Sequence, residues 1–352
     1  MAKLQKLNEP QWRLIERVDD ENDKRTLATA FAALPLKYFV PNGAQERVIK
    51  AIDKVMGEST TPVVLYTFAN GVGKTSSTEH ILCNLIYGPQ NAWFDYDVFR
   101  RFPFPKEVWY CSTGEAIKGT IVPDLMKLLI PGTFKAYKDG KPHVSRIEFN
   151  NKWKIVFKTF DQNPETYESA NVGVIIADEP MPEPLWKAVK SRRRMGSLTL
   201  LPMTPLYTPP YILDEVHSAA ERGDLGYEWL TASVYDACKR RGVRGHLNPQ
   251  TIDEMVANYD PDEREARAFG KFQFFSQKVY GRLNKELHFV DPKDYPIPEG
   301  SEFRQIVDPH DGRPPAAIWM ATTPSGRRII FDEYPIRKDK PYWEMDNRVT
   351  AR

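Results

Sequence analysis

The chain has 352 residues, and its 49 Lys and Arg against 47 Asp and Glu give a formal net charge of only +2. This balance provides no global electrostatic argument for nucleic acid as a partner, so only local groups of charge can provide one. The three cysteines lie far apart, which argues against a disulfide framework or a zinc site and favours reduced thiols. The sequence shows no apolar run long enough to cross a bilayer and no signal-peptide core, so we expect no membrane partner.

Residues 1–33 are predicted to form a charged helical arm at the N-terminus. Within it, Trp12, Ile15 and Val18 recur at helical spacing and would share one face. We expect this face to pack on the domain that follows.

A phosphate-binding loop is predicted directly after the apolar run 63–68. The run enters a glycine-containing turn that closes on Gly-Lys-Thr, and a helical pattern follows. Backbone N–H groups of such a loop and the start of its helix bind phosphates. Lys74 is expected to reach the β- and γ-phosphates of a nucleotide, and the Thr75 hydroxyl to bind Mg²⁺. The predicted nucleotide-binding residues of the loop are Asn70, Gly71, Val72, Gly73, Lys74, Thr75 and Ser76.

The loop departs from the usual motif at its first glycine, a position that Phe68 occupies here. Asn70 and Gly71 supply the turn instead. Just upstream, Gln45 follows an aromatic residue and a Pro-Asn-Gly turn. Its amide offers a donor and an acceptor that match N6 and N7 of adenine, which makes ATP the expected nucleotide. The alternative is a glutamine at a helix start that faces solvent.

A second motif lies at 172–180, where an apolar run ends in two acids before a proline. At the end of a buried strand, Asp178 would hold the water shell of Mg²⁺, and Glu179 would polarise the attacking water as a catalytic residue. The alternative is a strand that ends in two acids at a proline turn without a catalytic role. The motif follows the phosphate loop by about a hundred residues, with strands between, as nucleotide-binding α/β folds require.

Other elements are predicted between and after these two motifs. They are strands at 107–113, 197–206 and 228–234, a hairpin around an Asn-Asn turn at 146–157, and an amphipathic helix at 119–130. The strand at 197–206 ends in Thr204 before a proline. A hydroxyl there can sense the γ-phosphate and relay its loss, so Thr204 joins Lys74 and Glu179 among the predicted catalytic residues.

Two basic segments each have two interpretations. The helix at 183–194 ends in three arginines, which suit the dipole of a helix C-terminus. Alternatively, one of these arginines completes the site of a neighbouring subunit or binds a DNA phosphate. The loop 239–246 is either solvated, as most charge runs are, or faces DNA or another subunit.

A small helical pair is predicted after the sheet. Asn248-Pro249 and Asp260-Pro261 are both typical of a helix N-cap followed by proline, and the second helix is expected to end by Phe272. We expect this pair to form a lid beside the nucleotide.

The last part of the chain changes character after a proline-containing linker at 292–298. Strands are predicted at 304–310, 316–321 and 328–332. Asp308 lies near the end of the first of them, where ribonuclease-H-like nucleases place a ligand of a two-metal site. The alternative is a turn-forming Asp-Pro.

In order and spacing, these motifs resemble those of the large terminase subunits of tailed bacteriophages, the ATPases that package DNA into a procapsid. The resemblance runs from about residue 38 to the C-terminus, and in this family the phosphate loop often lacks its first glycine, as at Phe68. It rests on 39–45, 70–75, 175–180, 203–206, 235–236, 260–272 and 308–310.

The resemblance implies an α/β fold: a P-loop NTPase with a central, mostly parallel sheet flanked by helices, a small helical lid and the start of a ribonuclease-H-like nuclease domain. The predicted parts are an N-terminal helical arm at 1–33, an ATPase core at 34–235, a lid at 236–275, a linker at 276–300 and an incomplete nuclease domain at 301–352. It also implies Mg²⁺ and ATP as cofactors, with a divalent metal for a complete nuclease.

For partners, the resemblance implies double-stranded DNA, a portal protein, a small terminase subunit and a homo-oligomeric ring, commonly a pentamer. Such a motor works in the host cytoplasm, docks transiently on the procapsid and is absent from the mature virion. Two departures limit the likeness. The stretch 168–171, just before the second motif, contains no arginine, so the sequence does not identify the arginine that would act in trans. The further nuclease carboxylates are expected beyond residue 352, and Asp311, Asp332 and Glu333 are not assigned, so we expect no DNA cleavage by this chain alone.

The expected function is ATP-driven translocation of double-stranded DNA, with contacts mainly to phosphates. The alternative is a DNA helicase or restriction-type translocase, which would need a second RecA-like lobe. A nucleotide-binding regulatory protein is less favoured, because a switch needs no base directly after Asp178. The sequence has no Asn-Lys-x-Asp motif, which argues against a GTPase.

Overall fold

The computed structural model describes residues 19–141, 143–167, 170–206, 208–239, 244–261, 263–272, 289–309 and 316–334. By its contacts the chain divides into two compact units, Met1–Phe274 and Phe275–Arg352, and each is described here by itself. The helix predicted around Trp12 lies outside the described residues. Within the described residues, no helix is both long and apolar enough to span a membrane.

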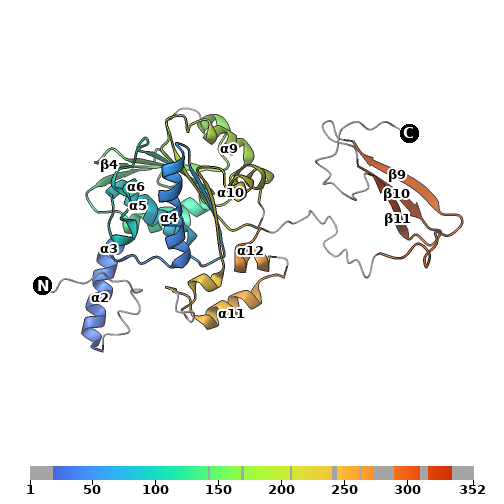
Figure 1. Cartoon of the computed structure of the whole chain (residues 1–352), viewed down its shortest axis with the longest axis horizontal. Coiled ribbons are helices and arrows are strands. Elements are labelled where there is room, and N and C mark those ends of the chain that lie inside the picture. Colours follow the sequence, from blue (N-terminus) through green and yellow to red (C-terminus); the bar gives the residue numbers. More distant parts are fainter. Residues whose placement is uncertain are drawn as a thin grey trace. The chain divides into compact units, whose positions relative to one another are not determined.

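The first unit is built from a large sheet and helices on both of its faces (Figure 1). Its described helices are α2 Glu21–Ala33, α3 Pro35–Tyr38, α4 Gly43–Glu58, α5 Lys74–Tyr87, α6 Asp97–Arg100, α7 Gly114–Ala116, α8 Val122–Leu128, α9 Glu183–Lys190, α10 Ser218–Arg222, α11 Pro249–Asn258 and α12 Arg264–Phe269. Its described strands are β1 Val63–Phe68, β2 Glu107–Ser112, β3 Phe134–Tyr137, β4 Arg146–Phe149, β5 Lys154–Thr159, β6 Val174–Ala177, β7 Leu198–Met203 and β8 Tyr227–Ala232.

The strand order is β3-β4-β5-β2-β6-β7-β1-β8, an eight-stranded sheet in the part of the chain that the structure describes. From β5 to β8 every neighbouring pair is parallel, while β4 pairs antiparallel with β3 and β5. This is the mostly parallel sheet of a P-loop NTPase fold, as predicted. Because the carboxyl ends of parallel strands meet at one edge, the loops after β1, β2, β6 and β7 lie together there.

Side chains of alternate residues in each strand form two hydrophobic cores, one on each face of the sheet. In β1, Val64 and Tyr66 pack in the core that includes α4 and α5, whereas Val63 and Leu65 pack in the core that includes α9. Successive strand residues point to opposite faces, so an apolar run without alternation is what a strand covered on both faces requires. All six residues of β1 are buried, which holds the loop that follows it in a fixed position.

The structure corrects two helix boundaries. The segment Asp260-Pro261 does not begin a helix: the N–H of Glu263 donates to the carbonyl of Asp260 at 2.9 Å in a turn, and α12 starts at Arg264. Proline fits the second position of such a turn as well as it fits a first helical turn, so the local pattern was ambiguous. The helix predicted to reach 194 ends at Lys190. The other predicted start is confirmed, since Asn248 caps α11 and its side chain accepts the N–H of Gln250.

The second unit contains a three-stranded antiparallel sheet among its described residues, in the order β11-β10-β9. Its strands are β9 Glu302–Asp308, β10 Ala316–Thr322 and β11 Arg328–Tyr334. They lie where the sequence predicts strands. Asp308 is the last residue of β9, and the ribonuclease-H-like fold of this unit stays a prediction.

Candidate functional site

The predicted phosphate loop connects β1 to α5 at the carboxyl edge of the sheet. Gly71 and Gly73 have φ of +78° and +92°, a left-handed conformation that side chains rarely adopt. Turns that alternate right- and left-handed residues form concave nests of N–H groups that bind anions. The helix α5 begins at Lys74, directly after Gly73, so its positive dipole end faces the same place.

Lys74 lies at the centre of the site. Its Nζ donates to the carbonyl of Phe68 at 3.0 Å and to Oγ1 of Thr204 at 2.9 Å. Burial lowers the pKa of this ammonium, while the nearby carboxylates of Glu179 and Asp178 oppose that effect. The chain therefore brings three residues predicted as catalytic, Lys74, Glu179 and Thr204, to one point from three different segments.

Asp178 and Thr75 form a pair of oxygen ligands suited to Mg²⁺. The Thr75 hydroxyl donates to Oδ2 of Asp178 at 3.1 Å, and the hydroxyl of Tyr110 donates to the same oxygen at 3.3 Å. Mg²⁺ is bound through one or two protein oxygens together with substrate phosphates and waters, so a larger protein cage is not needed. Among the described residues no group of three or more His, Cys, Asp or Glu could hold a metal.

Burial and the charge of Glu179 raise the pKa of Asp178 to about 6 from an ordinary value of 3.8. The folded state therefore binds a proton at Asp178 more tightly than the unfolded state does. As the pH rises from about 4 through 6, ionisation of Asp178 lowers the free energy of unfolding. The difference in pKa corresponds to roughly 3 kcal/mol at most. Metal binding would compensate this cost, since it stabilises the ionised form.

We therefore expect Asp178→Asn to stabilise the metal-free protein at pH 7, by about 1–3 kcal/mol, and to have little effect at pH 4. The same variant should lose the stabilisation that Mg²⁺ and ATP give together. Urea unfolding in chelator at the two pH values, and thermal unfolding with and without ligand, measure both effects. Asp253→Asn, at an exposed position of α11, is the control. A less stable Asp178→Asn protein at pH 7 would contradict the interpretation.

Glu179 adopts an uncommon backbone conformation, with φ of +74°. For a residue other than glycine this conformation is strained, and such strain gathers at functional sites. The carboxylate accepts the N–H of Thr204 at 3.1 Å, and the Thr204 hydroxyl lies 3.0 Å from Oδ1 of Asn70. Burial raises the pKa of Glu179, whereas Lys74 and the hydrogen bonds from Thr204 lower it. A carboxylate with a raised pKa is a better proton acceptor, as a general base requires.

Gln45 is buried, so the solvent-facing alternative is wrong. Its Oε1 accepts the N–H of Asn42 at 3.0 Å in a capping box at the start of α4, and its Nε2 donates to the carbonyl of Gly73 at 3.1 Å. Asn42 adds a second link, from Nδ2 to the carbonyl of Val72 at 2.9 Å. The start of α4 thus clamps the phosphate loop, and adenine recognition by Gln45 stays a prediction.

The clamp gives an expected result for Gln45→Ala. Losing the bond to Gly73 should loosen the loop and weaken ATP and GTP binding alike, by about fivefold, the value of one ordinary hydrogen bond. Titration with fluorescent analogues of the two nucleotides measures this, with the exposed Gln250→Ala as the control. A loss confined to the adenine nucleotide would instead establish Gln45 as the base reader.

Glu79 is an acid beside the site that the sequence does not single out. It lies on the buried face of α5, one turn after Thr75, and only 3% of it is exposed. Burial, with the charges of Asp124 and Asp178, raises its pKa to about 9, so it is neutral at pH 7 and adds no charge beside Asp178. Glu79 follows Thr75 by four residues, a spacing that puts both on one helix face, so the sequence could have indicated this acid. Nothing in the sequence indicates a role for the hydroxyl of Tyr110, which lies inside a predicted strand.

The predicted lid contacts the phosphate loop. Nε2 of His246 lies 3.0 Å from the carbonyl of Gly71, and a Cβ on Gly71 would lie 3.4 Å from Cδ1 of Leu247 and 3.7 Å from Cε of Met255. The N–H of Asn70 donates to the carbonyl of Arg267 at 2.9 Å. Both lid helices, α11 and α12, therefore lie against the glycine turn.

The arginines after α9 lie far from this loop. Arg193 is buried and donates to the carbonyl of Thr61, which precedes β1, and Nε of Arg194 donates to Asn171 at 3.1 Å. The phosphate loop follows β1, so the length of a six-residue strand, about 20 Å, separates it from Arg193. Arg193 does not fit the helix-dipole interpretation, because α9 ends at Lys190 and the guanidinium donates to a carbonyl before β1. Arg193 and Arg194 cannot reach the site of their own chain, and a contact with a neighbouring subunit or with DNA stays a prediction.

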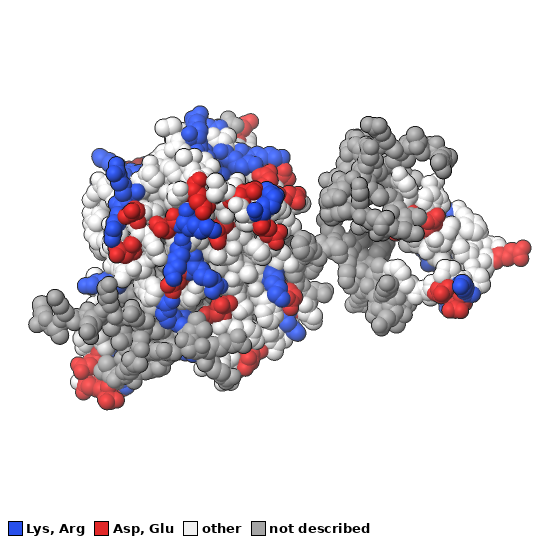
Figure 2. Space-filling model, viewed as in Figure 1, with Lys and Arg blue, Asp and Glu red and all other residues white. Residues whose placement is uncertain are grey.

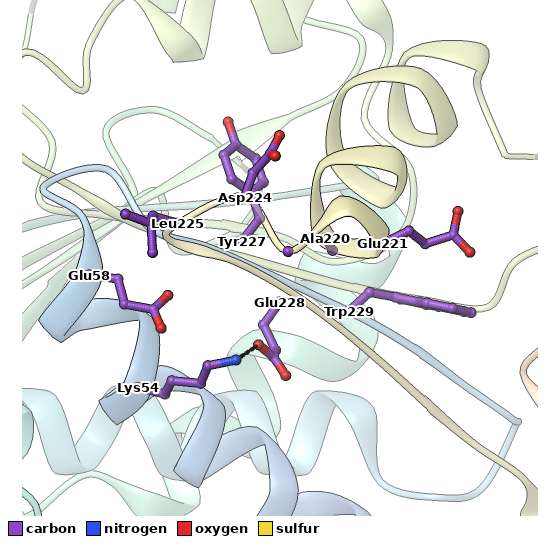
Figure 3. A pocket seen from close by; sticks show the side chains of 10 residues that line it. Lys54, Glu58, Ala220, Glu221, Asp224, Leu225, Tyr227, Glu228 and Trp229 are labelled. Atoms are coloured by element: carbon purple, nitrogen blue, oxygen red, sulfur yellow. Dashed lines mark hydrogen bonds and ion pairs between the residues drawn. The ribbon is translucent and has the colours of Figure 1, made fainter.

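A pocket of about 210 Å³ lies beside the start of β8, at the opposite edge of the sheet (Figure 3). Lys54 and Glu228 form an ion pair across it at 2.7 Å, with Glu58 close by. None of the residues predicted for nucleotide chemistry lines it. Its distance from the phosphate loop excludes it as part of the candidate site.

Comparisons with known proteins identify no family for this chain. No protein-family model matches the sequence, and no curated protein matches it. Among solved structures, the large terminase from a thermophilic bacteriophage, in complex with ADP, is similar, with a TM-score of 0.48 and 13% sequence identity. The match covers 83% of this chain and 69% of that chain. A likeness at this level assigns no function, so the residues of the site carry the argument that follows.

Proposed function

We propose that the chain hydrolyses ATP with Mg²⁺ and uses the free energy to move double-stranded DNA into a procapsid. The observation that supports hydrolysis is the meeting of Lys74, Thr75, Asp178, Glu179 and Thr204 at one edge of the sheet. An anion nest, a buried cation, a pair of magnesium ligands and a buried carboxylate are the parts that phosphoryl transfer needs. The order of the motifs along the chain supports the packaging role.

Each residue has a part in this proposal. Lys74 and the nest hold the phosphates, and Thr75 and Asp178 would hold Mg²⁺, which neutralises charge that develops on the phosphates. Glu179 accepts a proton from the attacking water and orients it. Thr204 touches both Lys74 and Glu179, so it connects phosphate occupancy to the position of the base.

The DNA contacts are proposed to be mainly to phosphates, with a portal protein and a small terminase subunit as partners of a ring of identical chains, a pentamer in this proposal. The motor would act in the host cytoplasm while docked on the procapsid, and would be absent from the mature virion. On the face seen in Figure 2, Lys and Arg lie among Asp and Glu. Two lysines of α4 form ion pairs, Lys50 with Glu46 and Lys54 with Glu228.

The experiment is ATP hydrolysis by the purified chain with duplex DNA, single-stranded DNA or none, over a range of protein concentrations. A packaging motor should be stimulated by duplex DNA, and the rate per chain should rise with concentration as the ring assembles. Stimulation should fall steeply with salt, because it depends on phosphate contacts. Turnover by the dilute monomer with single strands alone would favour the helicase. Nucleotide binding without turnover under all conditions would favour the regulatory protein.

A further inference from the structure

Helix α12 is fixed to the phosphate loop and to the sheet at its C-terminal end. Besides the bond from Asn70 to the carbonyl of Arg267, the Thr231 hydroxyl donates to the carbonyl of Gly270 at 3.1 Å. Gly270 has φ of +64°, and a Cβ there would lie 2.3 Å from the carbonyl oxygen of Thr67 and 2.7 Å from that of Ala232. Only glycine fits this place between the ends of β1 and β8. The helix is therefore held at a fixed distance from the nest.

The side chain of Arg267 forms a partly exposed ion pair that it can leave for another partner. Its Nε donates to Oε2 of Glu263 at 2.5 Å, one turn earlier on the lid, and about a third of the side chain is exposed. Ion pairs of this kind, four residues apart and near solvent, contribute little to stability. Arginine binds phosphate more strongly, because its planar guanidinium can donate two parallel bonds to a doubly charged group. A nucleotide phosphate within reach would therefore compete successfully with Glu263.

The backbone of Arg267 lies beside the residues predicted for catalysis. The backbone of Arg267 lies against Asn70, whose Oδ1 accepts from Thr204. A bound triphosphate would extend from the nest toward Thr204 and Glu179, and its terminal phosphate would therefore lie on the side of the site that Arg267 approaches.

We propose that Arg267 is a binding residue supplied by the lid of the same chain, which leaves Glu263 and donates to the terminal phosphate of a bound nucleoside triphosphate. This rests on the proposed function. A nucleoside diphosphate lacks that phosphate, so Arg267 would distinguish substrate from product. The terminal phosphate would then be bound by an arginine of the same chain in addition to Lys74.

The experiment compares the affinities of ADP and a non-hydrolysable ATP analogue, both with Mg²⁺, in the full chain and in Arg267→Ala. The analogue should bind 10- to 100-fold more weakly, the value of a hydrogen bond to a charged group, while ADP affinity changes less than about twofold. Arg267→Gln is shorter and uncharged but keeps an N–H that can donate to Glu263, and it should show the same selective loss if the alanine variant does not fold. Lys271→Ala removes an exposed charge from the same lid and should change neither affinity.

Equal losses for both nucleotides would overturn the proposal, because they would mean that Arg267 only supports the lid. Unchanged binding of the analogue in Arg267→Ala or Arg267→Gln would overturn it as well. Failure of the proposed function is seen in the unmodified chain instead, which would then bind neither nucleotide or bind ATP without turnover.

Discussion

Glu179→Gln should bind ATP with nearly normal affinity and hydrolyse it about 10²- to 10⁴-fold more slowly, the range that removal of a general base gives. The amide keeps the shape of the carboxylate and can still accept the N–H of Thr204, so the loop after β6 should remain in place. It cannot accept a proton from water. The measurements are steady-state release of phosphate and the affinity for a non-hydrolysable analogue.

Glu183→Gln is the matched control, because Glu183 lies four residues further along the chain, at the exposed start of α9. It should leave turnover unchanged. If Glu179→Gln kept more than a tenth of the activity, the base would have to be another group, and the strained backbone at Glu179 would need a different explanation.

The second large effect is expected for Lys74→Ala, which should reduce turnover by about 10²- to 10³-fold and weaken nucleotide binding. Lys74 is the cation that faces the two carboxyls of the site, and its charge lowers the pKa of both Asp178 and Glu179. Without it, the pKa of Asp178 should rise above its present value of about 6, so that part of this group is protonated near neutral pH. Mg²⁺ would then compete with a proton.

Residual turnover of Lys74→Ala should therefore increase between pH 7 and pH 8.5, whereas the rate of the unmodified chain should already be level there. Phosphate release over this range measures the shift. Lys50→Ala, an exposed lysine on α4, is the control and should keep the normal profile. A parallel profile in the two proteins would mean that Lys74 does not set the charge of Asp178.

The parts of the fold that sequence predicts well are those whose signal is local. The run 63–68 has no alternation because β1 is covered on both faces, and the glycines after it are needed for a left-handed turn. The two acids after β6 and Thr204 after β7 end strands that lie side by side in the sheet. Parallel strand ends meet at one edge, so their convergence follows from topology.

The parts that sequence does not predict depend on contacts between distant segments. Nothing local to Gln45 indicates that its amide reaches the carbonyl of Gly73, 28 residues away. Arg267 becomes notable only once α12 is placed against Asn70. At Asp260 the failure had a different cause, since a turn and a helix start use the same residues and packing decides between them.

The close packing around Gly270 limits how the predicted lid can move. The end of α12 is held against the ends of β1 and β8, so the helix can move toward the site only by rotating about Gly270. The start of α12 would then move further than its end, while Arg267, one turn from Gly270, would hardly shift. Binding of the nucleotide would thus rotate the side chain of Arg267, and a small rotation at Gly270 would become a larger displacement at the start of α12.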